Sequence, residues 1–266
     1  MIEIPLDPNV HLGPISLAWH GIFTAVGIFF GVALPLRLLR GRVSEDDGYA
    51  VATWGVVGGI LGARVVHVID QAPYYIAHPE LIPAIWTGGI AIWGAAIGGV
   101  LGGFIAALRR GVPIGYAADA AAPGLGLGFA IGRIGDIVNG EHHAMACTPP
   151  AGMCVGYTDP ATLGQPGPVH LVVAYDMLWD LASVALTLWL RRAFAGRWPD
   201  GVVFWIWMAQ YAIGRFLLGF LRIDDPTYAF RLRQDQVIAV LVLAAAVPML
   251  ARLLSRSPAP ARSLAV

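Results

Sequence analysis

Apolar residues are gathered along the chain into seven long runs, separated by short polar or proline-containing segments. An α-helix rises 1.5 Å per residue, so a run of about 20 apolar residues spans the roughly 30 Å hydrocarbon core of a bilayer. The fourth run is the most polar, since it contains Asp119 and Pro123 and is otherwise rich in glycine and alanine. Small residues permit close helix packing in lipid, which predicts a central position for this run. The seven runs cover residues 17–37, 49–69, 86–108, 114–132, 171–190, 201–221 and 236–254.

The composition agrees with a membrane protein. Of the 266 residues, 57% are hydrophobic and 13% are charged, and the mean hydropathy is +0.67, whereas soluble domains carry about 25% charged residues. Composition and pattern together predict an all-α fold, a polytopic membrane bundle of about seven transmembrane helices. The formal net charge of zero argues against a nucleic-acid partner. All 17 basic residues are arginines, which excludes Schiff-base chemistry and a Walker-type lysine.

Arginines mark one end of alternate runs, and this asymmetry predicts the orientation of the bundle. Arginine is enriched in cytoplasmic loops, so the ends that carry arginine clusters are expected in the cytoplasm. The N-terminus then faces outward and the C-terminus inward, within a single transmembrane domain of residues 1–266. The tail at 255–266 is expected to be disordered. The clusters lie at residues 37–42, 109–110, 191–197 and 252–262.

The longest outward loop is expected to form a small cap at about residues 133–170, which are rich in proline and glycine. It holds both cysteines of the chain, Cys147 and Cys154. Two cysteines in an exported loop predict a disulfide bond. The alternative is a metal site, for which His142 or His143 would have to join the cysteines. We favour the disulfide and expect no metal site.

The most polar stretch beside an apolar run is GRIGDIVNGE, at residues 132–141. It brings Arg133, Asp136, Asn139 and Glu141 together and separates them with glycines, which permit turns and a close approach of backbone to a ligand. A guanidinium can hold a phosphate through two parallel hydrogen bonds. The stretch is therefore interpreted as the polar floor of a site for a lipid headgroup. A helix-end loop with a salt bridge is the alternative.

Other charged residues fall inside the apolar runs or at their outer ends. An arginine at mid-bilayer costs about 2.5–3.5 kcal/mol on insertion scales, so each one is a functional candidate. Arg133 and Arg215 come from different helices and are expected to clamp an anionic headgroup from opposite sides. The constellation predicted in the outer half of the bundle comprises Arg64, His67, Arg133, Asp136, Asn139, Glu141, Asp176, Arg215 and Arg222.

Structural roles are the alternatives for several of these residues. Arg64 could pair with Asp119 or Asp70 and hold helices together. Arg222 could be an interfacial anchor beside the aspartates at 224–225. The tryptophans of the apolar runs are interpreted as aromatic-belt or packing residues; they are Trp86, Trp93, Trp205 and Trp207.

These stretches resemble, in order, the motifs of a known enzyme family. GRIGDIVNGE is similar to the signature of the prolipoprotein diacylglyceryl transferases, and six further motifs occur in the expected helices. The resemblance covers nearly the whole chain, and several motifs in order are far more specific than a lone glycine pattern. The further motifs are WHG (19–21), LGARVVHV (61–68), IWTGGIAIWGAAIGG (85–99), DAAAPGLGLG (119–128), VHLVVAYD (169–176) and YAIGRFLLGFLR (211–222).

The resemblance implies a reaction at a bacterial plasma (inner) membrane that needs no cofactor. Members of the family transfer the diacylglyceryl group of phosphatidylglycerol to the lipobox cysteine thiol of a prolipoprotein signal peptide. The reaction forms a thioether and releases glycerol-1-phosphate. By the same resemblance, Arg133 would bind phosphatidylglycerol and Arg215 would be the second essential arginine. Further candidates for the headgroup site and substrate binding are Asn139, Glu141, Tyr175, Arg64, Arg222 and Gly94.

The chain departs from the family pattern at four positions. Trp93 replaces a third-helix histidine that is proposed as general base, and Asp136 replaces a usual asparagine of the signature. His20 stands where tyrosine is common, and Gly219 where glutamate is usual. Trp93 cannot accept a proton, so the candidates for a catalytic base are His20, Asp136 and Glu141. The alternatives are a thiol that ionises without a dedicated base, and a diverged protein with altered or lost activity.

Two other functional classes are considered. Intramembrane charges alone would fit a small-solute transporter or channel. Such proteins commonly have two repeated halves, and this chain shows no internal repeat. An intramembrane protease would need a serine–histidine pair or paired membrane aspartates, and Ser16, Ser44 and Ser183 lie at poor positions for this chemistry. We therefore favour the transferase.

Overall fold

The computed structural model describes the chain except for residues 14, 86–87, 90, 151, 224–225 and 256–266. Trp86, the aspartates at 224–225 and the predicted tail from residue 256 onward therefore lie outside the described residues. Contacts divide the chain into two units, one made of Met1–Pro35 with Ala118–Val266 and the other of Leu36–Ala117. The single transmembrane domain stays a prediction.

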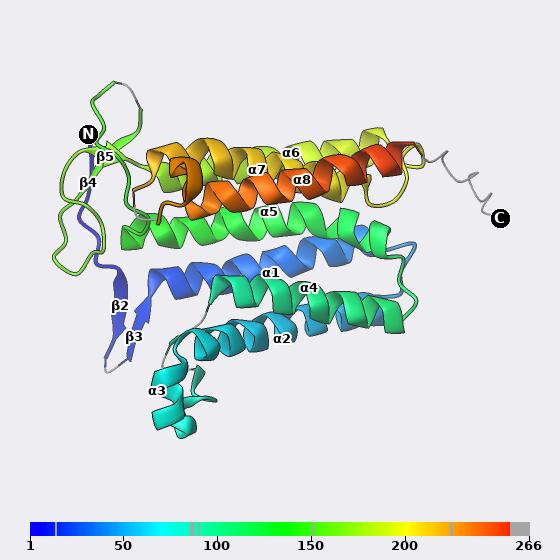
Figure 1. Cartoon of the computed structure of the whole chain (residues 1–266), viewed down its shortest axis with the longest axis horizontal. Helices are drawn as coiled ribbons and strands as arrows, with labels where there is room; N and C mark the ends of the chain where they lie inside the picture. The colour runs from blue at the N-terminus through cyan, green and yellow to red at the C-terminus, as the bar shows by residue number, and fades with distance from the viewer. Residues whose placement is uncertain (14, 86–87, 90, 151, 224–225, 256–266) are drawn as a thin grey trace. The chain divides into compact units, whose positions relative to one another are not determined.

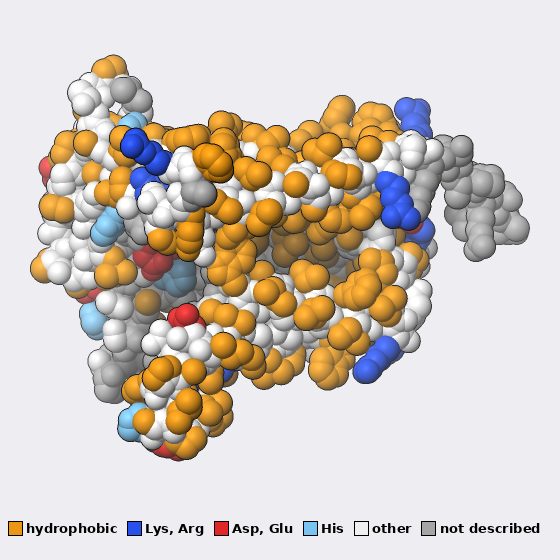
Figure 2. Space-filling model, in the orientation of Figure 1, with side chains coloured by type: hydrophobic (Ala, Val, Ile, Leu, Met, Phe, Trp, Pro, Cys, Tyr) orange, Lys and Arg blue, Asp and Glu red, His pale blue; other side chains and the backbone are white. Residues whose placement is uncertain are grey.

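Apolar helices make up most of both units (Figure 1), and apolar side chains cover their visible flanks (Figure 2). Six helices of the described chain are long and apolar enough to cross a membrane, at residues 19–39, 45–70, 114–139, 172–193, 202–221 and 234–254. A further apolar helix, α4 (Ile92–Arg109), is shorter than these spans over its residues 93–109. These helices agree with the predicted polytopic membrane bundle, whereas the orientation of their ends stays a prediction.

The third apolar run begins its helix later than predicted. The expected segment covers residues 86–108, but α4 starts at Ile92. Gly88 and Gly89 have φ angles of 87° and 76°. This left-handed conformation is incompatible with a right-handed helix, and glycine adopts it at little steric cost. The glycines therefore shorten the apolar helix at its N-terminal end.

The fourth run continues further than predicted. The helix α5 (Ile114–Asn139) does not end at residue 132 but includes Arg133 and Asp136. It ends just before Gly140, which has a φ of 76° and occupies the left-handed position that commonly terminates helices. Most of the signature stretch therefore lies in the last two turns of a helix, and not in a loop.

The first unit contains α1 (Trp19–Leu39, with its last turn in the second unit), α5 (with its first turn in the second unit), α6 (Val172–Ala193), α7 (Val202–Leu218) and α8 (Gln234–Leu254). Glycines bring α1 and α5 together, since a Cβ on Gly27 would lie 2.6 Å from the carbonyl oxygen of Gly128. In the α5 and α6 spans 39% of residues are buried, against 11% in α1 and α8. The fourth run therefore belongs to the more buried helices of the first unit, and its central position stays a prediction.

A buried carboxylate joins α5 to the beginning of α7. Asp119 accepts hydrogen bonds from the backbone N–H groups of Gly201 and Phe204, both at 2.8 Å. Helix N-termini leave such donors without partners and carry a partial positive charge. Asp119 thus caps α7 from a neighbouring helix, which explains an acidic residue near the start of an apolar run.

The second unit pairs α2 (Glu45–Asp70) with α4, and α3 (Ala72–Ala77) and the 3₁₀ turn η1 (Pro79–Leu81) follow α2. Glycines face each other along this helix pair. A Cβ on Gly98 would lie 2.9 Å from Cα of Gly62, and a Cβ on Gly62 would overlap the carbonyl oxygen of Gly94. The two backbones are therefore in direct contact, as small residues allow in membrane helices.

The described chain adds five short strands to the predicted helices. The N-terminal strand β1 pairs in parallel with β4, and β4 pairs with β5, so residues that precede the first helix belong to the cap. The hairpin β2–β3 leads into α1. Each strand has two to four residues, too few for an alternating pattern to stand out in the sequence. The strands are β1 (Ile2–Ile4), β2 (Asn9–Leu12), β3 (Ile15–Ala18), β4 (Cys154–Tyr157) and β5 (Val169–His170).

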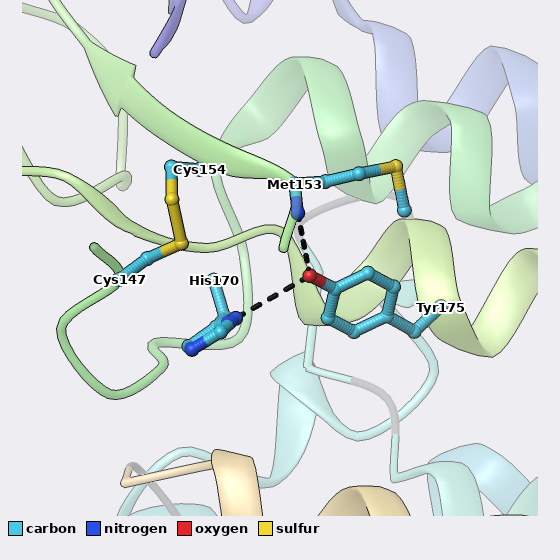
Figure 3. Close-up of a disulfide and its surroundings, with 5 residues drawn as sticks. All are labelled: Cys147, Met153, Cys154, His170 and Tyr175. Carbon is cyan, nitrogen blue, oxygen red and sulfur yellow. Dashed lines mark hydrogen bonds between the residues drawn. A yellow bond between two sulfur atoms is a disulfide. The ribbon is translucent and has the colours of Figure 1, made fainter. Parts of the chain in front are cut away.

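The predicted disulfide between Cys147 and Cys154 is confirmed, and it closes the loop beside β4 (Figure 3). The hydroxyl of Tyr175, in the first turn of α6, accepts a hydrogen bond from the backbone N–H of Met153 at 2.8 Å. It also lies 3.3 Å from Nδ1 of His170. The cross-linked loop is therefore attached to the helix that carries Asp176.

Candidate active site

The last two turns of α5 hold a carboxylate that is bonded on both oxygens. Nη1 of Arg133 donates to Oδ2 of Asp136 at 2.8 Å, one helical turn away. Nδ1 of His20, in the first turn of α1, lies 2.7 Å from Oδ1 of the same carboxylate. Asp136 is buried, while 44% of the His20 side chain is exposed. The histidine thus contacts both the buried ion pair and the surroundings.

A second buried carboxylate, Asp176 on α6, lies within ion-pair distance of three arginines from different parts of the first unit. Its Oδ2 lies 3.2 Å from Nη1 of Arg215 on α7 and 4.0 Å from Nη2 of Arg133 on α5. Arg222, just after the 3₁₀ turn η3 (Gly219–Leu221), donates to the same oxygen. Arg133 and Arg215 therefore approach the same carboxylate oxygen, whereas their predicted clamp on an anionic headgroup stays a prediction.

Arg222 lies inside the protein and is not the interfacial anchor considered as an alternative. Its side chain is fully buried and bonded to Asp176, and its Nε has no hydrogen-bond partner among the described residues. The cap positions it, because Ala144 forms a β-bridge with Arg222 and Met145 N–H donates to the carbonyl of Leu221. Arg222 therefore belongs to the charged cluster.

Asn139 and Glu141 continue the site at the end of α5. Nδ2 of Asn139 donates to Oε1 of Glu141 at 3.1 Å, and the same Oε1 lies 3.6 Å from Nδ1 of His20. Glu141 also lines an open cavity of about 530 Å³, together with His142, His143 and Leu163. Small-molecule sites commonly have volumes of about 300–1,000 Å³. The cavity is therefore large enough for a lipid headgroup or the reactive end of a peptide.

Two predicted substrate-binding residues lie in the second unit. Arg64 is buried and donates to the carbonyl oxygens of Leu81, Ile82, Gly88 and Gly89. Carbonyl dipoles, rather than the acidic side chains considered as alternatives, thus satisfy its guanidinium and fix the chain before α4. Gly94 packs against the backbone of Gly62 in the glycine contact between α2 and α4. Roles of Arg64 and Gly94 in substrate binding stay predictions.

Tyr175, also predicted to bind substrate, uses its hydroxyl within the cap, as Figure 3 shows. Its contribution to the site is the attachment of the disulfide loop next to Asp176, and direct substrate contact stays a prediction. Among the tryptophans, Trp207 is buried and stacks on Tyr211 at 5.7 Å between ring centroids. The packing role predicted for Trp207 is confirmed.

His20, Asp136 and Glu141 could form a metal site by geometry alone, because one ligand atom from each lies within 4.8 Å of the others. The same carboxylate of Asp136 is engaged by the Arg133 guanidinium at 2.8 Å. A divalent cation placed there would be repelled by that fixed positive charge. The donor set therefore fits proton exchange better than metal binding.

Sequence reasoning missed two acidic members of the cluster. Asp235, at the start of α8, lies 3.5 Å from Nη2 of Arg215. Asp180 is buried on α6, one turn after Asp176. Both residues sit within or beside apolar runs, and this placement is the signal by which they could have been found.

Comparisons with known proteins agree with the resemblance in the motifs. The sequence model of the prolipoprotein diacylglyceryl transferase family matches residues 9–252. A curated phosphatidylglycerol–prolipoprotein diacylglyceryl transferase 1 of Streptomyces coelicolor is 35% identical over 92% of this chain and 72% of its own length. Transferases of the same name from Trichormus variabilis and Dehalococcoides mccartyi are 38% and 34% identical. They align over 81% and 94% of this chain, and over 78% and 94% of their own lengths.

Proposed function

Because the chain belongs to the prolipoprotein diacylglyceryl transferase family, we propose that it transfers the diacylglyceryl group of phosphatidylglycerol to a lipobox cysteine thiol in a prolipoprotein signal peptide. The products are a thioether-linked lipoprotein precursor and glycerol-1-phosphate. The family match over nearly the whole chain favours this transferase over a solute transporter.

The observation that carries the site proposal is the convergence of Arg133 and Arg215 on one oxygen. Oδ2 of Asp176 lies within 4.0 Å of both guanidinium groups. A phosphate oxygen also carries negative charge and accepts hydrogen bonds from arginine. A phosphodiester beside Asp176 would therefore be within reach of both arginines, one from α5 and one from α7.

These arginines stabilise the transition state more than the bound substrate. As the carbon–oxygen bond breaks, the phosphate changes from a diester with one negative charge toward a monoester with two. Donors already aimed at the growing charge lower the barrier, because they need no reorganisation during the reaction. The buried surroundings of Arg133 and Arg215 strengthen this attraction compared with bulk water. Arg222, which contacts the same oxygen of Asp176, adds to this positive charge.

Asn139 and Glu141 hold the glycerol end of the lipid at the cavity. Oδ1 of Asn139 is buried and has no hydrogen-bond partner among the described residues, so a glycerol hydroxyl would satisfy it. Glu141 lines the cavity and is held by Nδ2 of Asn139. The cavity then admits the acceptor cysteine beside the phosphate.

We place this site on the outward side of the bacterial plasma membrane. In the first unit, Asp176 and Arg215 lie at the ends of α6 and α7 that adjoin the cap. The arginines at the opposite ends of α6 and α8 are Arg191, Arg192 and Arg252. Arginine-rich helix ends face the cytoplasm in most membrane proteins, which supports an outward site and a cytoplasmic C-terminus.

The test is mass spectrometry of a lipobox peptide after incubation with the purified protein and phosphatidylglycerol. The unmutated protein should add one diacylglyceryl group to the cysteine. Arg133→Ala and Arg215→Ala should each lower kcat/KM by at least about 10²-fold, the typical effect of removing a donor to transition-state charge. Arg133→Lys should fall in between, since lysine keeps the charge but cannot bind bidentately.

Arg252→Ala is the matched control, because Arg252 is an exposed arginine in the last turn of α8. It should retain the activity of the unmutated protein. No lipidation by the correctly folded unmutated protein would refute the transferase proposal. Full activity of folded Arg133→Ala would remove the phosphate-binding role of this residue alone.

A further inference from the structure

His20 and Asp136 meet at a contact between α1 and α5 that needs a glycine. A Cβ on Gly135 would lie 2.6 Å from Cα of His20 and 3.1 Å from its backbone nitrogen. The glycine therefore lets the first turn of α1 lie directly against α5. This contact brings together two side chains that are 116 residues apart in the sequence. Both positions depart from the family pattern, and the structure shows that the two departures are partners.

The pair has the arrangement of a base and the residue that orients it. Nδ1 of His20 lies 2.7 Å from Oδ1 of Asp136, so an Nδ1–H that donates to this carboxylate leaves Nε2 with the lone pair. Asp136 is buried and its second oxygen accepts from Arg133, which fixes the carboxylate in place. A neighbouring carboxylate also stabilises the imidazolium that forms when Nε2 takes a proton.

His20 is partly exposed and lies next to a residue that lines the cavity. Its side chain is 44% exposed, and Nδ1 lies 3.6 Å from Glu141, which lines the cavity. The alternative bases are less suited to the role. Nε2 of His142 lies 3.3 Å from Nη1 of Arg133, whose N–H can occupy the lone pair that a base would need. Glu141 already accepts a hydrogen bond from Asn139. A tryptophan indole, as in Trp93, donates a hydrogen bond but does not accept a proton.

We propose that His20 is the general base that takes the proton from the acceptor thiol, and that Asp136 is the positioning residue that holds its tautomer. This inference rests on the proposed transferase function and assigns the base for that reaction.

The proton and electron balance follows directly. The S–H proton moves to Nε2 of His20, and the resulting thiolate attacks the primary carbon of the diacylglyceryl group. The carbon–sulfur bond forms while the carbon–oxygen bond breaks, and its electron pair stays on the phosphate oxygen. The imidazolium then returns its proton to glycerol-1-phosphate or to water, so that the enzyme is regenerated.

His20→Gln is the decisive variant, because glutamine can still hydrogen-bond to Asp136 but cannot act as a base. A general base contributes about 10²–10⁴-fold to a rate, so kcat for lipidation of the peptide should fall by that factor, with little change in KM for phosphatidylglycerol. His20→Tyr is the second variant and should show the same loss. The matched control is His11→Gln, because His11 forms an exposed pair with Asp7 at 3.1 Å and should retain full activity.

The pH profile separates a base from a structural residue. The unmutated enzyme should lose kcat at low pH as His20 becomes protonated, and this acid limb should be absent in His20→Gln. The charged groups that face His20 are Asp136, Glu141, Arg133 and, beside Asp136, His142. Asp136→Asn removes the carboxylate that favours the imidazolium. The acid limb should therefore move to lower pH, and kcat should fall by less than in His20→Gln.

Folded His20→Gln or His20→Tyr with kcat within about threefold of the unmutated enzyme would overturn this inference. An acid limb that persists in His20→Gln and disappears in Glu141→Gln would overturn it as well, because Glu141 would then be the base. In both cases the unmutated protein still lipidates the peptide, so the proposed function stands. Absence of lipidation by the unmutated protein is the separate result that refutes the proposed function.

Discussion

At the residue scale, the charged cluster contains a carboxylate, Asp176, that neutralises part of the positive charge of its arginines. Oδ2 of Asp176 contacts Arg133, Arg215 and Arg222, so three guanidinium groups share one carboxylate oxygen. Removing one partner of a buried ion pair leaves the other charge uncompensated, at a cost of about 3–5 kcal/mol. Asp176 therefore stabilises the arginines when the site holds no lipid, and a bound phosphate would take over part of this role.

The variant Asp176→Asn tests this role. The uncharged amide should lower the midpoint of thermal unfolding in neutral detergent by several degrees. Phosphatidylglycerol should recover more of this loss than phosphatidylcholine does, because the anionic lipid supplies the missing negative charge. Asp70→Asn, on an exposed residue of α2, is the control and should melt like the unmutated protein. Equal melting of Asp176→Asn and the unmutated protein would contradict the role of Asp176.

The sequence identifies residues such as Arg133 and Arg215 because arginine is costly in an apolar run. It does not identify their partners, since these contacts depend on tertiary structure. Arg222 contacts Asp176 across 46 positions, and Arg64 uses backbone carbonyls that carry no signal in the residue type. His20 and Asp136 are likewise predicted separately, and only the fold shows that they form a pair.

At the element scale, the helix pair α2–α4 depends on direct backbone contact. A Cβ on Gly98 would overlap the carbonyl oxygen of Gly58 and lie 2.9 Å from Cα of Gly62. These atoms belong to the backbone of a helix and cannot move aside without separating the pair. The nearest neighbours of a Cβ on Gly103, on the same helix, lie at 3.7 Å, which is an ordinary contact.

The same substitution at these two glycines should therefore have different effects. Gly98→Ala should reduce stability by about 1–3 kcal/mol, the usual range for overpacking. Gly103→Ala should be neutral or slightly stabilising, because alanine has the higher helix propensity. Thermal unfolding in detergent measures both variants. Equal loss of stability in the two would show that backbone contact does not hold this helix pair together.

The long apolar runs predict the helices well, because a membrane span requires both length and low polarity. Their boundaries are less certain where glycine is frequent, since glycine fits both a helix and a left-handed turn. Gly88 and Gly89 delay the start of α4, whereas Gly132 and Gly135 lie within α5. The strands of the cap are set by tertiary pairing, as between Ile2 and Val155, and have no sequence pattern of their own.

At the scale of the whole molecule, the predicted orientation places the cap outside and the end of α8 in the cytoplasm. Single cysteines at Leu163 and Ser255 would test it, since both residues are exposed and lie near the cap cavity and at the end of α8. A membrane-impermeant maleimide should label Leu163→Cys in intact cells and Ser255→Cys only after permeabilisation. The unmutated protein, with Cys147 and Cys154 bonded to each other, is the unlabelled control. The reverse labelling pattern would contradict the orientation.

The hydrogen bonds that Asp119 accepts at the start of α7 connect two helices, each of which carries an arginine of the charged cluster. Arg133 follows Asp119 by 14 residues on α5, and Arg215 follows Gly201 by 14 residues on α7. The distance along the helix from this contact to each arginine is therefore the same in α5 and α7, about 21 Å at 1.5 Å per residue. With one end fixed, a relative rotation of only about 5° displaces an arm of that length by about 2 Å. A slight tilt where Asp119 contacts α7 would therefore be enough to change the distance between the two guanidinium groups.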